Sequence, residues 1–304
     1  MSEITFKDRV AIVTGAGAGL GRSHALALAR RGVKVVVNDL GGTVAGEGGS
    51  PGPAEAVAQE IREGGGEAIA NGCSVTDADG VAAMVSEAIA TFGHVDILVN
   101  NAGVLRDKSF HKMSLEDFRF VLDVHLMGSV TCTKAVWDHM RERGYGRVVM
   151  TSSSSGIYGN FGQSNYGAAK MGLVGLMNVL HIEGASKGIH VNTLSPTAAT
   201  RMTEGLIPED MLKLMTPESV TAGLLYLASD EAPSRLILCA GAGGYAATRI
   251  TETDGVSLPE ELQTPEAIAE RIDAILNRDN EQMLEDGAGQ TMKFLNKAVA
   301  RRNG

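Results

Sequence analysis

The sequence has 304 residues, of which 44% are hydrophobic and 21% are charged, and its net charge is -9. A chain of this size and composition can bury the core of one large α/β domain or of two smaller ones. The acidic balance argues against nucleic acid or an anionic membrane as the main partner, and the longest apolar runs are too short to span a bilayer.

The cysteines and histidines predict neither a disulfide framework nor a metal site. Cys73, Cys132 and Cys239 are widely spaced and form no C-x-x-C pair. The seven histidines form no H-E-x-x-H or similar pair. A sparse, odd number of cysteines fits a reducing compartment, and the polar N-terminus has no recognisable export signal. We therefore expect a cytoplasmic protein.

A strand, a glycine turn and a helix are predicted in direct succession near the N-terminus. Residues 9–14 are a β-branched apolar run typical of a buried parallel strand. The turn that follows contains Gly15, Gly19, Leu20 and Gly21. Glycines allow a tight turn and close approach of a pyrophosphate, whose charge the helix N-terminus favours. These four residues are predicted to bind a dinucleotide.

The second predicted strand, residues 33–38, ends at Asp39, about twenty residues after the glycine turn. A carboxylate there can accept hydrogen bonds from the adenosine ribose and would repel a 2′-phosphate. No Arg or Lys lies in the turn before Leu20 or just after Asp39, so NAD is favoured over NADP. Residues 41–53 contain six glycines and two prolines and are predicted to form a mobile surface loop.

The run 67–75 resembles a third strand and its exit, where Ser74 and Val75 are expected to flank an adenine ring. Asp77 is predicted to cap the next helix. The apolar residues of that helix recur at helical spacing, which indicates a core face and not a site.

A fourth predicted strand, residues 95–100, runs into Asn101 and Gly103. A buried Asn side chain can lock neighbouring backbone segments, and Gly103 permits close approach of a ligand, although a plain turn is the alternative. Ser114 is the expected cap of a long helix that includes His125.

The fifth predicted strand, residues 146–151, ends in four serines, residues 152–155, where ligands of open α/β sheets bind. Tyr166 and Lys170 then lie one turn apart on one helix face. A tyrosine titrates near pH ~10, and a fixed cation beside it lowers its pKa toward the range of a general base. The pair is common by chance and gains weight only from the site around it.

The remaining chain continues the alternation of strand and helix. A sixth strand is predicted at residues 189–194, a helix at 217–228 and a last strand at 235–239. Residues 200–216 are amphipathic and rich in Met, typical of a lid or a surface helix. In the final sixty or so residues, a helix is predicted near residues 266–276. No internal repeat occurs, and the alternation predicts an α/β doubly wound parallel sheet.

Three motifs in order resemble those of the short-chain dehydrogenase/reductase family: the turn from Thr14 to Gly21, the run Asn100-Asn101-Ala102-Gly103, and the set Ser153, Tyr166 and Lys170. The resemblance covers residues 6 to about 240. It implies a single Rossmann-like domain, a nicotinamide cofactor and a homodimer or homotetramer.

The same resemblance assigns roles within the site. The spacing of 13 residues to Tyr166 selects Ser153 as the partner of the reacting oxygen. Tyr166 is expected to transfer the proton, while Lys170 lowers its pKa and holds the nicotinamide ribose. Pro196 and Thr197, after the sixth strand, are also expected to contact the cofactor.

A narrower resemblance joins residues 36–42, 105–110, 123–126 and 156–163 to the (3R)-hydroxyacyl-CoA dehydrogenase region of type 2 peroxisomal multifunctional enzymes, also called 17β-hydroxysteroid dehydrogenase type 4. The wider family has Asn where this chain has His125, whereas the narrower group shares the His. The hydratase and sterol-carrier regions of those enzymes are absent, and the chain ends without a Ser-Lys-Leu signal.

The expected function is oxidation of a (3R)-hydroxyacyl-CoA to the 3-oxoacyl-CoA with NAD, with Ser153, Tyr166 and Lys170 as catalytic residues. A 17β-hydroxysteroid dehydrogenase and a non-catalytic NAD-sensing protein are the alternatives. A reductase of acyl-carrier-protein thioesters is less expected, because such reductases usually have an NADP-preferring pattern. Asp39 argues against that pattern. Residues 1–240 are expected to form the NAD-binding domain, and residues 241–304 a C-terminal helical extension that packs on it or on a partner subunit.

Overall fold

The computed structural model describes residues 3–50, 52–198, 208, 211 and 213–303. The chain divides into two compact units, Met1–Ala247 and Thr248–Gly304, which are described separately below. No helix in these described stretches is long and apolar enough to cross a membrane.

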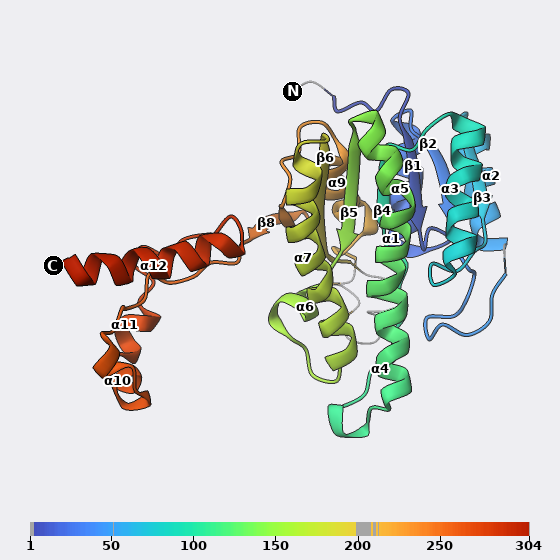
Figure 1. Ribbon diagram of the computed structural model, residues 1–304. Coiled ribbons are helices and arrows are strands. Elements are labelled where there is room, and N and C mark those ends of the chain that lie inside the picture. The colour runs from blue at the N-terminus through green and yellow to red at the C-terminus, as the bar shows by residue number, and fades with distance from the viewer. Residues whose placement is uncertain (1–2, 51, 199–207, 209–210, 212, 304) are drawn as a thin grey trace. The chain divides into compact units, whose positions relative to one another are not determined.

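The first unit is built on one sheet (Figure 1). Within the described residues the strand order is β3-β2-β1-β4-β5-β6-β7-β8, and every pairing from β3 to β7 is parallel. The strands are β1 Val10–Thr14, β2 Lys34–Asn38, β3 Ala68–Asn71, β4 Ile97–Asn100, β5 Gly146–Thr151, β6 Ile189–Thr197, β7 Ile237–Gly241 and β8 Gly244–Thr248. The predicted doubly wound parallel sheet is confirmed, and β8 was not predicted.

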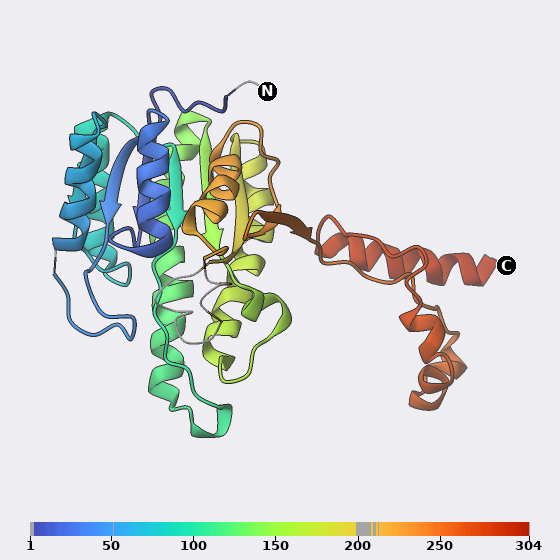
Figure 2. The ribbon, with the colours of Figure 1, turned by 180° about the vertical axis from the view of Figure 1, so that it is seen from behind.

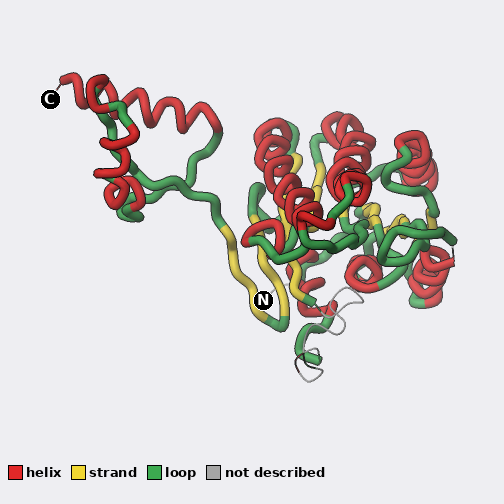
Figure 3. The backbone as a smooth tube through the Cα atoms, turned by 90° about the horizontal axis from the view of Figure 1, so that it is seen from below, coloured by secondary structure: helices red, strands yellow, loops and turns green. Residues whose placement is uncertain are grey.

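Helices cover both faces of this sheet, as the view from below shows (Figure 3). They are α1 Gly19–Arg30, α2 Gly52–Glu63, α3 Ala78–Phe92, α4 Leu115–Leu122, α5 Gly128–Arg143, α6 Ser154–Tyr158, α7 Ser164–Ala185 and α9 Pro217–Ala228, with a 3₁₀ turn at Phe110–Lys112. A π-helical turn, Asp123–Met127, joins α4 to α5. Asp77 and Ser114 cap α3 and α4 as predicted, since their side chains accept from the amides of Gly80 and Asp117.

Two apolar clusters, one on each face, hold the layers together. Alternate strand residues such as Val13 and Val37 pack with α1, α2 and α9, and α1 and α9 lie in front of the sheet in Figure 2. Their neighbours Ile12 and Val36 pack with α3, α5 and α7, which face the viewer in Figure 1. Strands buried on both faces read as continuous apolar runs, which is why the sequence identified them.

The second unit consists of a 3₁₀ turn and three helices: η3 Glu260–Leu262, α10 Pro265–Glu270, α11 Ile272–Leu276 and α12 Gly287–Asn303. The single helix predicted near 266–276 is therefore interrupted, at Arg271. Lys293 and Lys297 of α12 form ion pairs of 2.7 Å each with Glu252 and Asp254. Among the described residues of this unit, Ala267 is the one buried apolar side chain. Polar contacts such as these ion pairs therefore stabilise the unit more than an apolar core does.

Candidate active site

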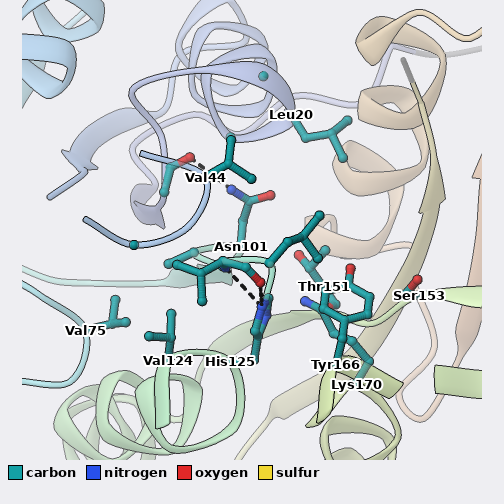
Figure 4. A pocket seen from close by; sticks show the side chains of 18 of the residues that line it. Leu20, Val44, Val75, Asn101, Val124, His125, Thr151, Ser153, Tyr166 and Lys170 are labelled. Carbon is teal, nitrogen blue, oxygen red and sulfur yellow. Dashed lines mark hydrogen bonds between the residues drawn. The ribbon is translucent and has the colours of Figure 1, made fainter. Parts of the chain in front are cut away.

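A cavity of about 600 Å³ lies at the carboxyl ends of the central strands, where open α/β sheets bind ligands. All of the residues that the sequence predicted for the site line it: Gly15, Gly19, Leu20, Gly21, Asp39, Ser74, Val75, Asn101, Gly103, Ser153, Tyr166, Lys170, Pro196 and Thr197. The structure thus brings together residues from seven separate segments of the chain, several of which are labelled in Figure 4.

The glycine turn after β1 has no room for a side chain at Gly15 or at Gly21. Gly15 has a φ of 63°, and a Cβ on it would lie 2.7 Å from the Cα of Ala102. A Cβ on Gly21 would lie 2.1 Å from the carbonyl oxygen of Gly15. The Asn101 side chain donates to the carbonyls of Thr14 and Gly15, at 3.0 Å each. Asn101 therefore locks the turn to the exit of β4, as the sequence suggested.

The Asp39 carboxylate is held in place by two backbone amides. Its Oδ2 accepts from the amide of Gly17 at 2.7 Å, and its Oδ1 accepts from the amide of Gly41 at 2.7 Å. A Cβ on Gly17 would lie 2.9 Å from Oδ2, so this position also needs glycine. Each carboxylate oxygen keeps a free lone pair for a ligand hydroxyl. The turn and the carboxylate together fit the diphosphate and adenosine ribose of a dinucleotide.

The four serines after β5 have different environments. Ser152 is fully buried, and its hydroxyl donates to the carbonyl of Lys170 at 2.8 Å, which fixes α7 against β5. Ser153, the N-cap of α6, lines the cavity, and its Oγ accepts from the amide of Ser155 at 3.2 Å. Ser153 also forms a side-chain hydrogen bond with Tyr166. The geometry therefore agrees with the choice of Ser153 over Ser152.

Tyr166 and Lys170 lie close together in the cavity wall, and burial shifts the pKa values of both. The Nζ of Lys170 lies 5.4 Å from the centre of the Tyr166 ring and donates to the carbonyl of Thr151 at 2.6 Å. Burial lowers the pKa of Lys170 to about 7. Burial also raises the pKa of Tyr166, and only the Ser153 hydrogen bond opposes it. Burial is therefore the largest cause acting on the pKa of Tyr166, and the expectation that Lys170 lowers this pKa stays a prediction.

His125 is buried in the middle of the π-helical turn and lies against Tyr166. The two rings are 5.1 Å apart and perpendicular. Its Nε2 lies 2.7 Å from the carbonyl oxygen and 3.1 Å from the amide nitrogen of Val104 (Figure 4). Burial and the charge of Lys170 keep the pKa of His125 well below its usual range. The neutral form of the ring is therefore favoured over the imidazolium form.

Several residues of the cavity were not predicted. Leu40, Gly42, Thr43, Val44 and Gly46 line it, so the glycine-rich segment after Asp39, a solvent-exposed loop as predicted, is also part of the cavity wall. Its glycines signalled a turn, but its position depends on contacts distant in sequence.

The predicted lid at residues 200–216 lies largely outside the described residues. Of this segment, Met215 lines the cavity. The described part of the chain contains no group of three His, Cys, Asp or Glu that could hold a metal ion.

The sequence matches the family model described as short chain dehydrogenase over residues 9–210. The chain is 45% identical over 302 residues to "Peroxisomal multifunctional enzyme type 2" of Mus musculus, a match that covers 97% of this chain and 41% of the mouse protein. The chain thus spans less than half the length of this relative.

Two solved structures show the same fold. The full-length peroxisomal multifunctional enzyme type 2 of Drosophila melanogaster superposes with a TM-score of 0.81 at 36% identity, covering 98% of this chain and 50% of that one. A 7α-hydroxysteroid dehydrogenase complexed with NADH and 7-oxo glycochenodeoxycholic acid gives a TM-score of 0.71 at 28% identity, covering 79% and 95% of the two chains.

Proposed function

Because this chain belongs to the short-chain dehydrogenase family and is an oxidoreductase acting on CH–OH, we propose that it oxidises a (3R)-hydroxyacyl-CoA to the 3-oxoacyl-CoA with NAD. The observation that carries this proposal is that Ser153, Tyr166 and buried Lys170 line one cavity together, with the Nζ of Lys170 5.4 Å from the centre of the Tyr166 ring. These three groups share one cavity with the glycine turn and Asp39.

The cofactor would be held at the glycine turn and at Asp39. The backbone amides of the turn and the N-terminus of α1 favour the diphosphate, and the oriented Asp39 carboxylate accepts from ribose hydroxyls while repelling a 2′-phosphate. Bound NAD supplies the hydride acceptor. The relative solved with NADH supports this choice of cofactor.

The chain's own groups handle the proton. Ser153 hydrogen-bonds the reacting oxygen, and Tyr166 accepts the hydroxyl proton as the hydride leaves the same carbon. In the reverse direction Tyr166 returns the proton. Lys170 uses one donor on Thr151 and keeps its others for the nicotinamide ribose and the phenol. The half-buried position of Tyr166 limits access of water to the reacting oxygen.

The substrate assignment rests on the relatives and on apolar residues of the cavity lining. Leu105 and Met215 are among them, and such side chains suit an acyl chain. The mouse and fly relatives carry names of multifunctional enzymes, and we take the hydroxyacyl thioester from that likeness. A hydroxysteroid is the second candidate, because a relative was solved with a 7-oxo bile acid.

The cellular location and the oligomeric state of the protein stay predictions. The alternative to a cytoplasmic location is the peroxisome, because the names of the mouse and fly relatives include the word peroxisomal. Fractionation of cells that express the full protein decides between the two locations. A homodimer or homotetramer gains support from the exposed apolar residues Val179 and Ile182 on α7, which need cover from water.

Replacing Tyr166 with Phe tests the proposal. The variant removes the one group that can take the proton, so we expect kcat to fall at least about 1,000-fold. NADH should bind nearly as before, since the glycine turn and Asp39 are untouched. Tyr226→Phe is the matched control, because Tyr226 lies on α9 outside the cavity. Full activity of Tyr166→Phe would contradict the assignment.

A further inference from the structure

Two segments of the cavity wall that are far apart in sequence are joined by hydrogen bonds. The glycine-rich loop after Asp39, residues 41–50, contributes Gly42, Thr43, Val44 and Gly46 to the lining, and Leu105, which follows β4, also lines the cavity. The amide of Leu105 donates to the carbonyl of Val44 at 2.9 Å. At Gly46 the loop also packs closely against α4, since a Cβ on Gly46 would lie 2.7 Å from the Phe120 ring.

Arg106 makes the contacts that hold this junction. Its Nε donates to the carbonyl of Ala45 at 3.3 Å. Its NH1 pairs with the Asp117 carboxylate of α4 at 2.9 Å, and its guanidinium lies 4.0 Å above the Phe120 ring. One planar side chain therefore bonds the loop, pairs with α4 and stacks on an aromatic ring, which a lysine cannot do.

The backbone of Arg106 continues the path to the catalytic helix. Its carbonyl accepts from the Nδ2 of Asn165 at 3.1 Å. Asn165 is fully buried, and its Oδ1 accepts from the amide of Tyr166 at 2.7 Å. The position of Arg106 is thus linked by hydrogen bonds to the cofactor loop on one side and to Tyr166 on the other.

We propose that Arg106 is a positioning residue that couples cofactor binding at the 41–50 loop to the placement of Tyr166 and the substrate. NADH that contacts the loop stabilises the arrangement in which Arg106 and Asn165 hold the start of α7. The substrate therefore binds more tightly once the cofactor is bound, and the reverse holds by linkage. This inference rests on the proposed function only for the choice of the two ligands.

The coupling is measured as the ratio of NADH dissociation constants without and with (3R)-3-hydroxybutyryl-CoA, a pair that cannot react because both are reduced. NADH fluorescence reports the binding, so turnover is not needed. We expect a ratio of about ten in the wild type. Arg106→Met should reduce the ratio to about one, and Arg106→Lys should leave an intermediate value, because lysine keeps the charge but not the fork.

Arg62→Met is the matched control. Arg62 also bonds one carbonyl, that of Ala68, and pairs with one carboxylate, that of Glu55, but it lies on α2 outside the cavity. The control should keep the wild-type ratio. If Arg106→Met does not fold, as judged by circular dichroism, Arg106→Lys carries the test.

The outcomes separate this inference from the proposed function. A wild type that binds no NADH overturns both. Suppose that the wild type binds NADH and oxidises the substrate. If it then shows no coupling, or if Arg106→Met keeps the wild-type ratio, only the role of Arg106 is overturned. An equal loss of coupling in Arg62→Met would show a general effect of lost stability, and would also overturn it.

Discussion

The acid strength of Tyr166 is set by its burial and by two neighbours that act in opposite directions. Burial raises the pKa of the phenol most, the Ser153 hydrogen bond lowers it, and the negative charge of Asp107 raises it. Asp107 was not singled out from the sequence; it comes close to Tyr166 because its carboxylate accepts from Gln163, at 2.6 Å, three residues before the tyrosine. Sequence spacing selected the catalytic serine, whereas desolvation depends on the folded environment.

Substitutions of the two neighbours should move the pH dependence in opposite directions. Oxidation of the alcohol needs the phenolate, so its rate rises with pH up to the pKa of Tyr166. Asp107→Asn removes a cause that raises this pKa and should shift the rising limb of kcat/KM to lower pH. Ser153→Ala removes a cause that lowers it, and should shift the limb upward while reducing kcat by about 100-fold. Rates measured between about pH 6 and 11 test both, and shifts in the same direction would contradict this account.

At the scale of elements, the strands, the caps and the glycine turn could be predicted because their signals are local. β-branched apolar runs marked the strands, and Asp77 and Ser114 marked two helix starts. The surface position of the glycine-rich loop was predicted correctly, but its place in the cavity wall was not, because its contacts with Leu105 and Phe120 come from segments sixty or more residues away. The π-helical turn around His125 also lacked a local signal, since its neighbours continue as ordinary helix.

The close contacts of the glycine turn predict how a substitution at Gly21 affects stability and NADH binding. Gly21→Ala would place a Cβ 2.1 Å from a backbone oxygen, so the turn must move. We expect a loss of stability of about 2 kcal/mol and clearly weaker NADH binding. Gly175→Ala is the control, because this exposed glycine of α7 has nothing within 4 Å, and the change should stabilise by up to about 1 kcal/mol. Thermal unfolding and NADH titration of both variants give the comparison, and an unchanged Gly21→Ala protein would refute the steric argument.

At the scale of the whole molecule, the two units differ in the interactions that stabilise each of them internally. Met1–Ala247 contains both apolar clusters and the cavity. The described part of Thr248–Gly304 buries one apolar side chain, Ala267, while side chains such as Phe294 and Val299 are exposed. The predicted boundary at residue 240 and the packing of the extension on the domain or a partner stay predictions.

This difference predicts how the units behave when separated. A protein of residues 1–247 should unfold cooperatively and bind NADH, because it keeps its core and the glycine turn. A peptide of residues 248–304 should lack stable helix in water, because short helices need tertiary packing. Circular dichroism and NADH titration measure both properties. A well-folded peptide, or a collapsed 1–247 protein, would contradict the analysis of the core.

The central claim is that the cavity oxidises a (3R)-hydroxyacyl-CoA with NAD. The most direct measurement follows NADH formation from short, long and sterol-side-chain (3R)-3-hydroxyacyl-CoAs, their (3S) counterparts and 17β-hydroxysteroids, with NAD and NADP in parallel. We predict that kcat/KM is highest for a (3R)-hydroxyacyl-CoA with NAD and at least about tenfold lower with NADP, as expected from the repulsion by Asp39. Faster oxidation of the steroids, or a preference for NADP, would contradict the claim.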